Sequence, residues 1–274
     1  MDAIALRTLN ILLGNDPGDA AIELALTGGV FAFQSPSTFA IGGAESAATL
    51  GTSKLEPYRV YRAVAGDILT IENLSAGRFC YFALGGGVDA ASVLGSRSTY
   101  LPGGFGGIGG RRLKVGDTIG VGARRTTRKH QVADSLPEAL RPKTSGAEIR
   151  FIARSDESEK EIAGVYHVSP SSDRTGYRLE GAPREGGASV TSEPVCPGVI
   201  QLPQGGEPII LMADAPTIGG YRVMGGVISA DLGILAQKLP GARIELVAIS
   251  VERAQRELEK LAEVETQIEE WCLS

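Results

Sequence analysis

The chain has 274 residues, of which 43% are hydrophobic and 5% aromatic, so it is long enough to bury a core in one or two domains. Its formal net charge of -5 provides no basic surplus, which argues against nucleic acid or an anionic membrane as a partner. Apolar runs are too short to span a bilayer and the N-terminus lacks the order of a secretory signal, so we expect a cytoplasmic protein.

The first half predicts a helix followed by many short strands. The helix is expected to begin after Asp2 and to stop at Gly14-Asn15. The pairs Gly66-Asp67 and Gly116-Asp117 are typical of hairpin turns. This half is therefore predicted to be a β-barrel or a sandwich, with strands at 30–33, 59–64, 68–71 and 79–84, of which the last two should be deeply buried.

The second half is separated by a charged stretch, Arg124 to Gly146, which contains two prolines and lacks apolar periodicity. Beyond it, a helix is expected over 229–237, and an amphipathic helix from Val251 to Trp271 should cover a barrel edge or contact a partner. Further strands are expected at 148–152, 199–202, 208–212 and 244–249. The predicted divisions are a first domain over 1–125, a linker over 126–147, a second domain over 148–250 and a terminal helix over 251–274.

Several familiar motifs are either absent from the sequence or stand in the wrong context. Gly104 to Gly109 spells G-x-G-x-x-G, but a short strand and turn, not a helix, is predicted over 111–117, so no dinucleotide site is expected. The P-loop and nucleophile-elbow patterns are absent, as is the Met-Lys-Met signal of a biotinyl domain. His130 and His167, the only histidines, suit no zinc site.

The cysteines number three, which is odd, and lie far apart, so we expect reduced thiols that act as small core residues. They are Cys80, Cys196 and Cys272.

Two polar segments carry the candidate chemistry. In the first, Arg97 can present a planar fork to a carboxylate, with Ser98 and Thr99 as neutral donors on glycine-opened backbone. In the second, strand alternation would place Arg174 and Arg178 on one face. The spacing alone leaves two interpretations open. These arginines can bind a ligand, or they can pair with carboxylates and hold turns against the rim of a barrel.

An ordered series of motifs in both halves resembles the biotin-dependent carboxyltransferase family, which includes the C subunit of 5-oxoprolinase, also called KipA or allophanate hydrolase subunit 2, and the carboxyltransferase domain of urea carboxylase. The resemblance runs from Asp2 to about Ala254. The residues that carry it are Gly85-Gly-Gly-Val-Asp89, Gly95-Ser-Arg-Ser-Thr99, Gly106-Gly107, Gly110-Arg111, Leu113, Gly116-Asp117, Asp173-Arg174, Gly176-Tyr-Arg-Leu-Glu-Gly181, Ser192-Glu193, Pro197-Gly198, Ile200-Gln201, Asp214, Thr217, Gly219-Gly-Tyr221, Asp231, Gln237 and Pro240-Gly241.

The resemblance implies a mainly β fold with a few helices, built as two cyclophilin-like β-barrel domains plus the C-terminal helix. It implies the C subunit of an ATP-dependent 5-oxoprolinase, which opens 5-oxoproline to glutamate together with a subunit-A-like and a subunit-B-like protein. No cofactor is attached to this chain in that interpretation, and a partner binds the ATP. Catalytic residues are not assigned, and the substrate-binding set that we expect is Arg97, Ser98, Thr99, Arg111, Asp173, Arg174, Tyr177, Thr217, Tyr221 and Asp231.

Two alternatives stay open. One is a carboxyltransferase subunit that acts on urea or a related amide, with carboxybiotin carried by another polypeptide. The other is a KipA-like regulatory protein that binds a KipI-like partner, similar to allophanate hydrolase subunit 1, and performs no chemistry. Two departures from the family pattern are expected to matter: a leading Gln-Asp-x-Gly-Arg segment does not precede Met1, and Pro216 stands where many relatives have glutamine.

Overall fold

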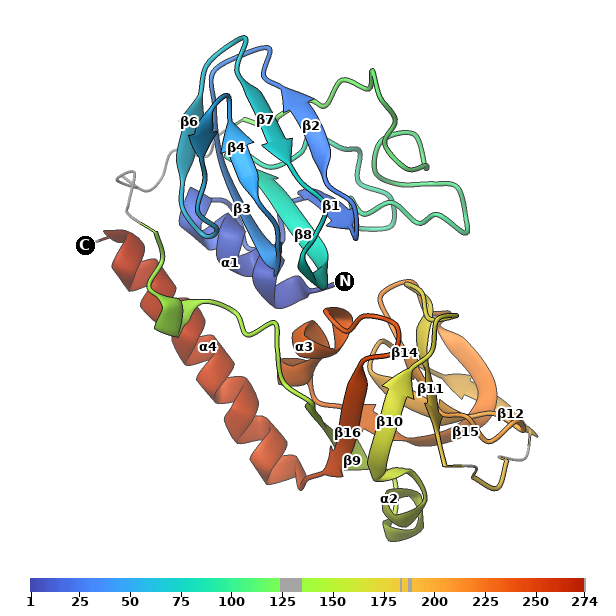
Figure 1. Cartoon of the computed structure of the whole chain (residues 1–274). Coiled ribbons are helices and arrows are strands. Elements are labelled where there is room, and N and C mark those ends of the chain that lie inside the picture. Colours follow the sequence, from blue (N-terminus) through green and yellow to red (C-terminus); the bar gives the residue numbers. More distant parts are fainter. Residues whose placement is uncertain (124–134, 183, 187–188, 274) are drawn as a thin grey trace. The chain divides into compact units, whose positions relative to one another are not determined.

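The computed structural model describes residues 1–123, 135–182, 184–186 and 189–273 (Figure 1). Its contacts divide the chain into two compact units. We call them the N-terminal unit, Ala3–Pro142 with Val264–Ser274, and the C-terminal unit, Lys143–Glu263 with Met1–Asp2. Strands dominate both, and the prediction of a mainly β fold with a few helices is confirmed.

The N-terminal unit combines helix α1 (Ala3–Leu13) with two four-stranded antiparallel sheets. One sheet has the order β1-β8-β3-β6 and the other β2-β7-β4-β5. The strands of this unit pair in two separate sheets, and the mainly β prediction for this half is confirmed. The strands are β1 (Ile22–Ala25), β2 (Gly29–Ala32), β3 (Ser37–Glu45), β4 (Ala48–Leu50), β5 (Ser53–Lys54), β6 (Tyr61–Ala63), β7 (Ile68–Ile71) and β8 (Ala76–Leu84).

Aromatic rings from both sheets meet in the core of this unit. The rings of Phe31 on β2 and Phe82 on β8 have centroids 4.9 Å apart, and Phe39 on β3 meets Phe82 edge to face at 5.7 Å. Phe39 and Phe82 are buried, and each such side chain contributes about 1.5–3 kcal/mol of hydrophobic stabilisation. The two sheets are therefore held together by one shared apolar layer.

Burial explains which strand predictions succeeded. Helix α1 packs on β3 and β8, so residues 79–84 are buried on both faces and form a continuous apolar run. The predicted deep burial is confirmed there. The prediction of deep burial is wrong for β7, whose residues alternate between exposed and buried and in which Ile68 is 49% exposed. The Gly66-Asp67 turn exists, but it joins β6 to β7 in different sheets and so makes no hairpin.

Beyond β8 the chain has little regular structure up to residue 123. Isolated bridges join Val88 to Val121 and Tyr100 to Phe105. The strand predicted over 111–117 is absent from this described stretch, although the Gly116-Asp117 turn forms, with the Asp117 N–H donating to the Lys114 carbonyl. The glycine-rich motif is followed by no helix, as expected, so it cannot hold a dinucleotide phosphate in the Rossmann manner.

The C-terminal unit contains a closed seven-stranded barrel. The strands run in the order β15-β13-β14-β11-β10-β16-β9, and β9 returns to pair with β15, while β12 adds to the outside of β15. All of these pairs are antiparallel except β9 with β16. The strands are β9 (Glu148–Ala153), β10 (Gly164–Val168), β11 (Gly176–Gly181), β12 (Ser189–Pro194), β13 (Val199–Leu202), β14 (Ile209–Leu211), β15 (Ile218–Val227) and β16 (Arg243–Ala248).

Helices flank the barrel strands along the sequence. Helix α2 (Asp156–Ile162) follows β9, and Ser155 caps it by accepting the Ser158 N–H. The predicted helix over 229–237 is confirmed as η2 (Ser229–Asp231) and α3 (Leu232–Ala236). The predicted amphipathic helix is α4 (Val251–Leu273), which extends two residues past the expected Trp271.

Part of the predicted linker lies on the N-terminal unit, since Leu136 is fully buried and its N–H donates to the Tyr58 carbonyl. A short 3-10 turn, η1 (Glu138–Leu140), follows. Residues 124–134, which include the first nine residues of that linker and His130, lie outside the described residues. Two of the three cysteines are buried as expected, and burial raises the pKa of Cys80 to about 11. The expectation is wrong for Cys196, which is exposed.

A buried ion pair ties β9 to the turn before α3. The Asp231 carboxylate is 1% exposed, and it accepts the Arg150 backbone N–H at 2.7 Å as well as two guanidinium hydrogen bonds at 2.9 and 2.6 Å. The remaining guanidinium nitrogen reaches Glu257 on α4 at 2.8 Å. These contacts make Arg150 the common anchor of a strand, a turn and a helix.

Removing the Asp231 carboxylate should strongly destabilise the C-terminal unit. We expect Asp231→Ala to lower the free energy of unfolding by about 3–5 kcal/mol, because a partly buried guanidinium loses its partner. Urea unfolding followed by circular dichroism measures this. Glu245→Gln, which removes the exposed pair with Arg243, is the matched control and should cost under about 1 kcal/mol. Equal losses in the two variants would contradict the assignment.

The Glu257 carboxylate should make stability depend on acid pH. Its hydrogen bonds to Lys260 and Arg150 lower its pKa from 4.5 to about 2. A depressed folded-state pKa stabilises the fold above pH 4.5, and this stabilisation disappears as the pH falls towards 2. The melting-temperature difference between wild type and Glu257→Gln should therefore shrink over this range. Glu259→Gln, on the exposed side of α4, is the control and should show a constant difference.

Candidate functional site

The first predicted group lies on the irregular segment of the N-terminal unit. A tight turn brings Val93 and Ser96 into mutual backbone hydrogen bonds, with Leu94 and Gly95 at positive φ between them. Arg97 follows this turn and is exposed, and its Nε donates to the Ala90 carbonyl at 3.1 Å. Its terminal nitrogens have no protein partner among the described residues, so the guanidinium retains donors for a ligand.

Glycines let a second loop come close to Ser98 and Thr99. A Cβ on Gly106 would overlap the Ser98 carbonyl oxygen, and a Cβ on Gly107 would overlap Thr99 Oγ1. Both glycines have positive φ, which L side chains rarely adopt. The structure thus brings together Ser98, Thr99 and the glycine-rich loop, as the sequence suggested.

Arg111 stabilises the loop in which it lies. Its two terminal nitrogens form a fork with Asp117, at 2.8 and 2.9 Å, and Asp117 also accepts the Lys114 N–H at 2.8 Å. The Arg111 guanidinium lowers the pKa of Asp117 well below its usual range. Because this fork is occupied, the position supports the alternative stated from sequence, an arginine that ties a turn.

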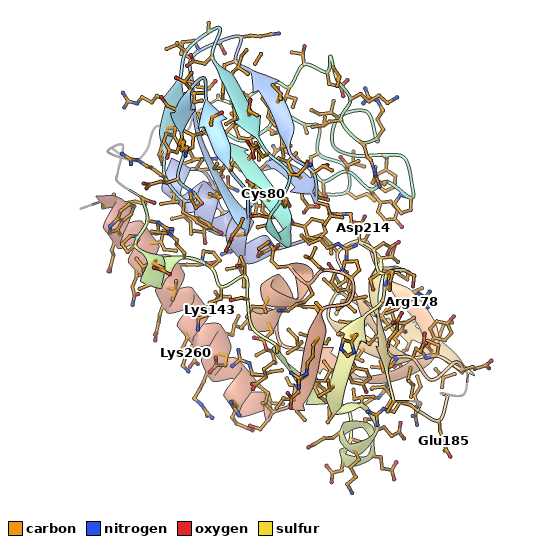
Figure 2. All side chains as sticks on the ribbon, viewed as in Figure 1. Cys80, Lys143, Arg178, Glu185, Asp214 and Lys260 are labelled. Atoms are coloured by element: carbon orange, nitrogen blue, oxygen red, sulfur yellow. The ribbon has the colours of Figure 1, made fainter. Side chains whose placement is uncertain are left out.

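The second predicted group joins two loops of the C-terminal unit. Arg174 forms a fork with Asp214 through Nε at 2.9 Å and Nη2 at 3.0 Å, and Asp214, labelled in Figure 2, is 8% exposed. Asp173 stabilises the turn before β11 by accepting the backbone N–H groups of Thr175 and Gly176. Arg174 therefore lies in this turn, and the prediction that it shares a strand face with Arg178 is wrong, because β11 begins at Gly176.

Tyr177 and Asp231 are buried and make contacts that stabilise the fold. Tyr177 is fully buried and its hydroxyl donates to the Ala236 carbonyl at 2.8 Å, which joins β11 to the end of α3. Asp231 is enclosed by Arg150. Neither position supports the predicted contact with a substrate. Family motifs combine residues that build the fold with residues that meet a ligand, and the sequence could not separate the two.

Thr217 and Tyr221 remain accessible on either side of a glycine pair. Thr217 is exposed and its carbonyl accepts the Val195 N–H, and Tyr221 is 46% exposed on β15. Between them, Gly219 lies against Gln201 of β13, where a Cβ would overlap Gln201 Nε2. With glycine at this position the carboxamide keeps its present place, and a larger residue would require it to move.

Gln201 is a functional candidate outside the predicted substrate-binding set. It is 4% exposed, and its Nε2 has no hydrogen-bond partner among the described residues. An unpaired buried donor costs about 1–3 kcal/mol, so its presence calls for an explanation. A usable signal was present, because one carboxamide interrupts the otherwise apolar strand Val199–Leu202.

The described residues contain no cluster of three or more His, Cys, Asp or Glu side chains that could hold a metal ion. His167 is exposed on β10. Across the same described ranges, every helix is too short or too polar to cross a membrane.

The strand-rich fold and the arginine and hydroxyl groups on glycine-rich loops are consistent with the resemblance to the biotin-dependent carboxyltransferase family. The family model of the carboxyltransferase domain, subdomains A and B, matches residues 1–248, and the chain belongs to this family.

Named relatives fall into two groups. The chain is 34% identical to the C subunit of 5-oxoprolinase from Escherichia coli, over 96% of this chain and 88% of the relative. It is 30% identical to urea amidolyase of Saccharomyces cerevisiae, over 93% of this chain but only 15% of the relative. A crystal structure of the K. lactis urea amidolyase aligns with a TM-score of 0.89 at 26% identity, covering 100% of this chain and 18% of that one.

The close approach at Gly107 gives a direct stability test. Gly107→Ala should unfold at lower urea than Gly104→Ala, because a Cβ at 107 meets Thr99 Oγ1 whereas at 104 it meets nothing within 4 Å. Both glycines have positive φ, so each variant carries a similar backbone cost of about 1–2 kcal/mol and the difference isolates the clash. Unfolding at the same urea concentration would contradict the geometry.

Proposed function

We propose that this chain is the C subunit of an ATP-dependent 5-oxoprolinase, which opens 5-oxoproline to glutamate. The observation that carries the proposal is the 34% identity to the Escherichia coli protein of that name over 96% of this chain. A second relative of the same name, from Haemophilus influenzae, is also 34% identical, over 93% of this chain. The described geometry adds residues suited to the chemistry.

The substrate combines a carboxylate with a lactam carbonyl. In the reaction a water adds to the lactam carbon, the C–N bond breaks and the nitrogen takes a proton, so that glutamate is released. Negative charge grows on the carbonyl oxygen along this path, and donors placed there lower the barrier. The proposed site therefore needs a guanidinium for the carboxylate and neutral donors for the oxygen.

Arg97 is our candidate for holding the carboxylate. Of the predicted arginines Arg97, Arg111 and Arg174, it is the one whose fork is not occupied by an aspartate in the described structure. Ser98 and Thr99 follow it in the chain and supply hydroxyl donors beside the glycine-rich loop. An arginine fork suits a planar carboxylate better than a lysine ammonium would.

In the C-terminal unit, Thr217 and Tyr221 keep their place in the predicted substrate-binding set, because both residues are exposed. The Arg174–Asp214 fork holds the turn before β11 against the loop after β14. We assign this pair, with Asp173, to positioning that loop. Arg111, Tyr177 and Asp231 are assigned to the fold, for the contacts described above.

Partners complete the proposal. The two 5-oxoprolinase relatives are each named as one lettered subunit, which implies an assembly of several subunits. We propose a subunit-A-like and a subunit-B-like protein as the partners, with ATP bound by one of them and the reaction carried out in the cytoplasm.

Carboxyl transfer to urea or a related amide is the second candidate, favoured by the family's name and by the urea amidolyase relatives. The donor would be carboxybiotin carried by another polypeptide. The carboxylate oxygens of carboxybiotin need N–H donors, as a lactam carbonyl does, and the Arg97 guanidinium offers such donors. The residues therefore fit both candidates, and an assay must separate them.

Reconstitution tests the proposal. The chain is combined with its subunit-A-like and subunit-B-like proteins, and glutamate is measured after addition of 5-oxoproline and ATP. We expect release that requires all three proteins and ATP. No glutamate from the complete mixture would overturn the proposal. Carboxylation of urea by the chain with a partner detected by avidin blotting would establish the alternative, and a tight complex without turnover would indicate a regulatory protein.

Changing the carboxylate-binding arginine should impair substrate use. In the reconstituted enzyme, Arg97→Lys is expected to lower kcat/KM for 5-oxoproline at least tenfold, about 1.4 kcal/mol of transition-state binding, because the planar fork is lost. Arg112→Lys, at another exposed arginine on the same segment, is the matched control and should leave kcat/KM unchanged. Equal effects in both variants would remove Arg97 from the site.

A further inference from the structure

A cavity of about 560 Å³ lies in the C-terminal unit, within the size range of small-molecule sites. One wall comes from the end of β9 and the start of α2, and the other from β12 and β15. No residue of the predicted substrate-binding set lines it. The function proposed above therefore leaves this cavity without a role.

Two guanidiniums line the cavity with donors to spare. Arg154 reaches Glu193 through Nη1 at 2.7 Å, and Arg222 reaches Glu161 through Nη2. Among the described residues each guanidinium makes its side-chain contact through a single nitrogen, and Arg222 Nε has no partner. Since a guanidinium carries five N–H donors, both can bind an anionic oxygen without giving up their glutamates.

An exposed carboxylate, that of Glu157, lies on the same wall as Arg154. Glu157, in the first turn of α2, forms no ion pair with the described residues. The charges at the cavity are thus two arginines, their two glutamates and Glu157, which leaves one negative charge in excess. Such a cavity disfavours a purely anionic ligand and favours one that brings a cationic group for Glu157.

The remaining lining is small, neutral and partly apolar. Thr191, Ser155 and Ser158 contribute hydroxyl groups, and Val190 and Val223 contribute methyl groups. A ligand with an uncharged aliphatic part can cover these valines and gain hydrophobic stabilisation.

From these features we infer that the cavity binds a zwitterionic α-amino acid with an aliphatic side chain. Its carboxylate is held by the spare donors of Arg154 and Arg222, its ammonium by Glu157, and its side chain lies against Val190 and Val223. Because β12 and β15 form one wall, the bound ligand braces the paired strands that also carry Tyr221.

Calorimetric titration of the purified full chain tests this inference without partners or turnover, so its failure is independent of the function proposed above. L-Leucine is the probe. We expect it to bind, and we expect at least tenfold weaker binding of 4-methylpentanoate, which lacks the ammonium, and of 3-methylbutylamine, which lacks the carboxylate. Absence of binding by L-leucine, or equal binding of the three compounds, would overturn the inference.

Variants locate the binding. Arg222→Gln and Glu157→Gln should each weaken L-leucine at least tenfold, whereas Arg243→Gln, which removes an exposed arginine of β16 paired with Glu245, should not. Thr191→Trp places an indole in the cavity while keeping every charged group, so it should weaken L-leucine binding at least tenfold even if Arg222→Gln perturbs the fold. Retention of full affinity in Thr191→Trp, with a native circular dichroism spectrum, would show that the amino acid binds elsewhere.

Discussion

Close approach of backbone at glycine is the constraint on which the candidate site depends. Residues 85–123 contain almost no regular strand, and no extended ladder of hydrogen bonds holds them in place. Instead Gly106 and Gly107 let one loop lie directly on Ser98 and Thr99, and the Arg111–Asp117 fork closes the next turn. Arg97 can thus present its guanidinium from a segment held by close backbone contacts, a side-chain fork and a few apolar residues, among them Val88 and Ala90, that reach the core of the unit.

Much of the fold could be predicted because burial leaves a periodic trace in the sequence. The continuous apolar run of β8 and the amphipathic pattern of α4 gave their boundaries to within a few residues. Predictions failed where the pattern is short. Ile68 belongs to an apolar run, yet it is exposed because β7 has only one buried face. A turn motif such as Gly66-Asp67 likewise says nothing about which sheet its flanking strands will join.

The candidate site was only partly predictable, for a different reason. Sequence motifs identify polar residues but not their partners, and the partner decides whether an arginine is available. Arg111 meets an aspartate on the same loop, six residues further on, whereas Arg174 meets one 40 residues away that local spacing could not pair with it. In the sequence Gln201 stands out only as one amide in an apolar strand, and the lack of a partner for its nitrogen is visible only in three dimensions.

The way in which the barrel closes has a consequence for its folding. Strand β9, the first of the barrel, completes its pairing only with β15 and β16, which come nearly last in the chain. Contacts between such distant segments carry a large loop-closure entropy, and they slow the search for the native state. During synthesis the barrel cannot close until residue 248 has left the ribosome. Before then the strand edges that later pair in the barrel are unpaired and can associate with other chains.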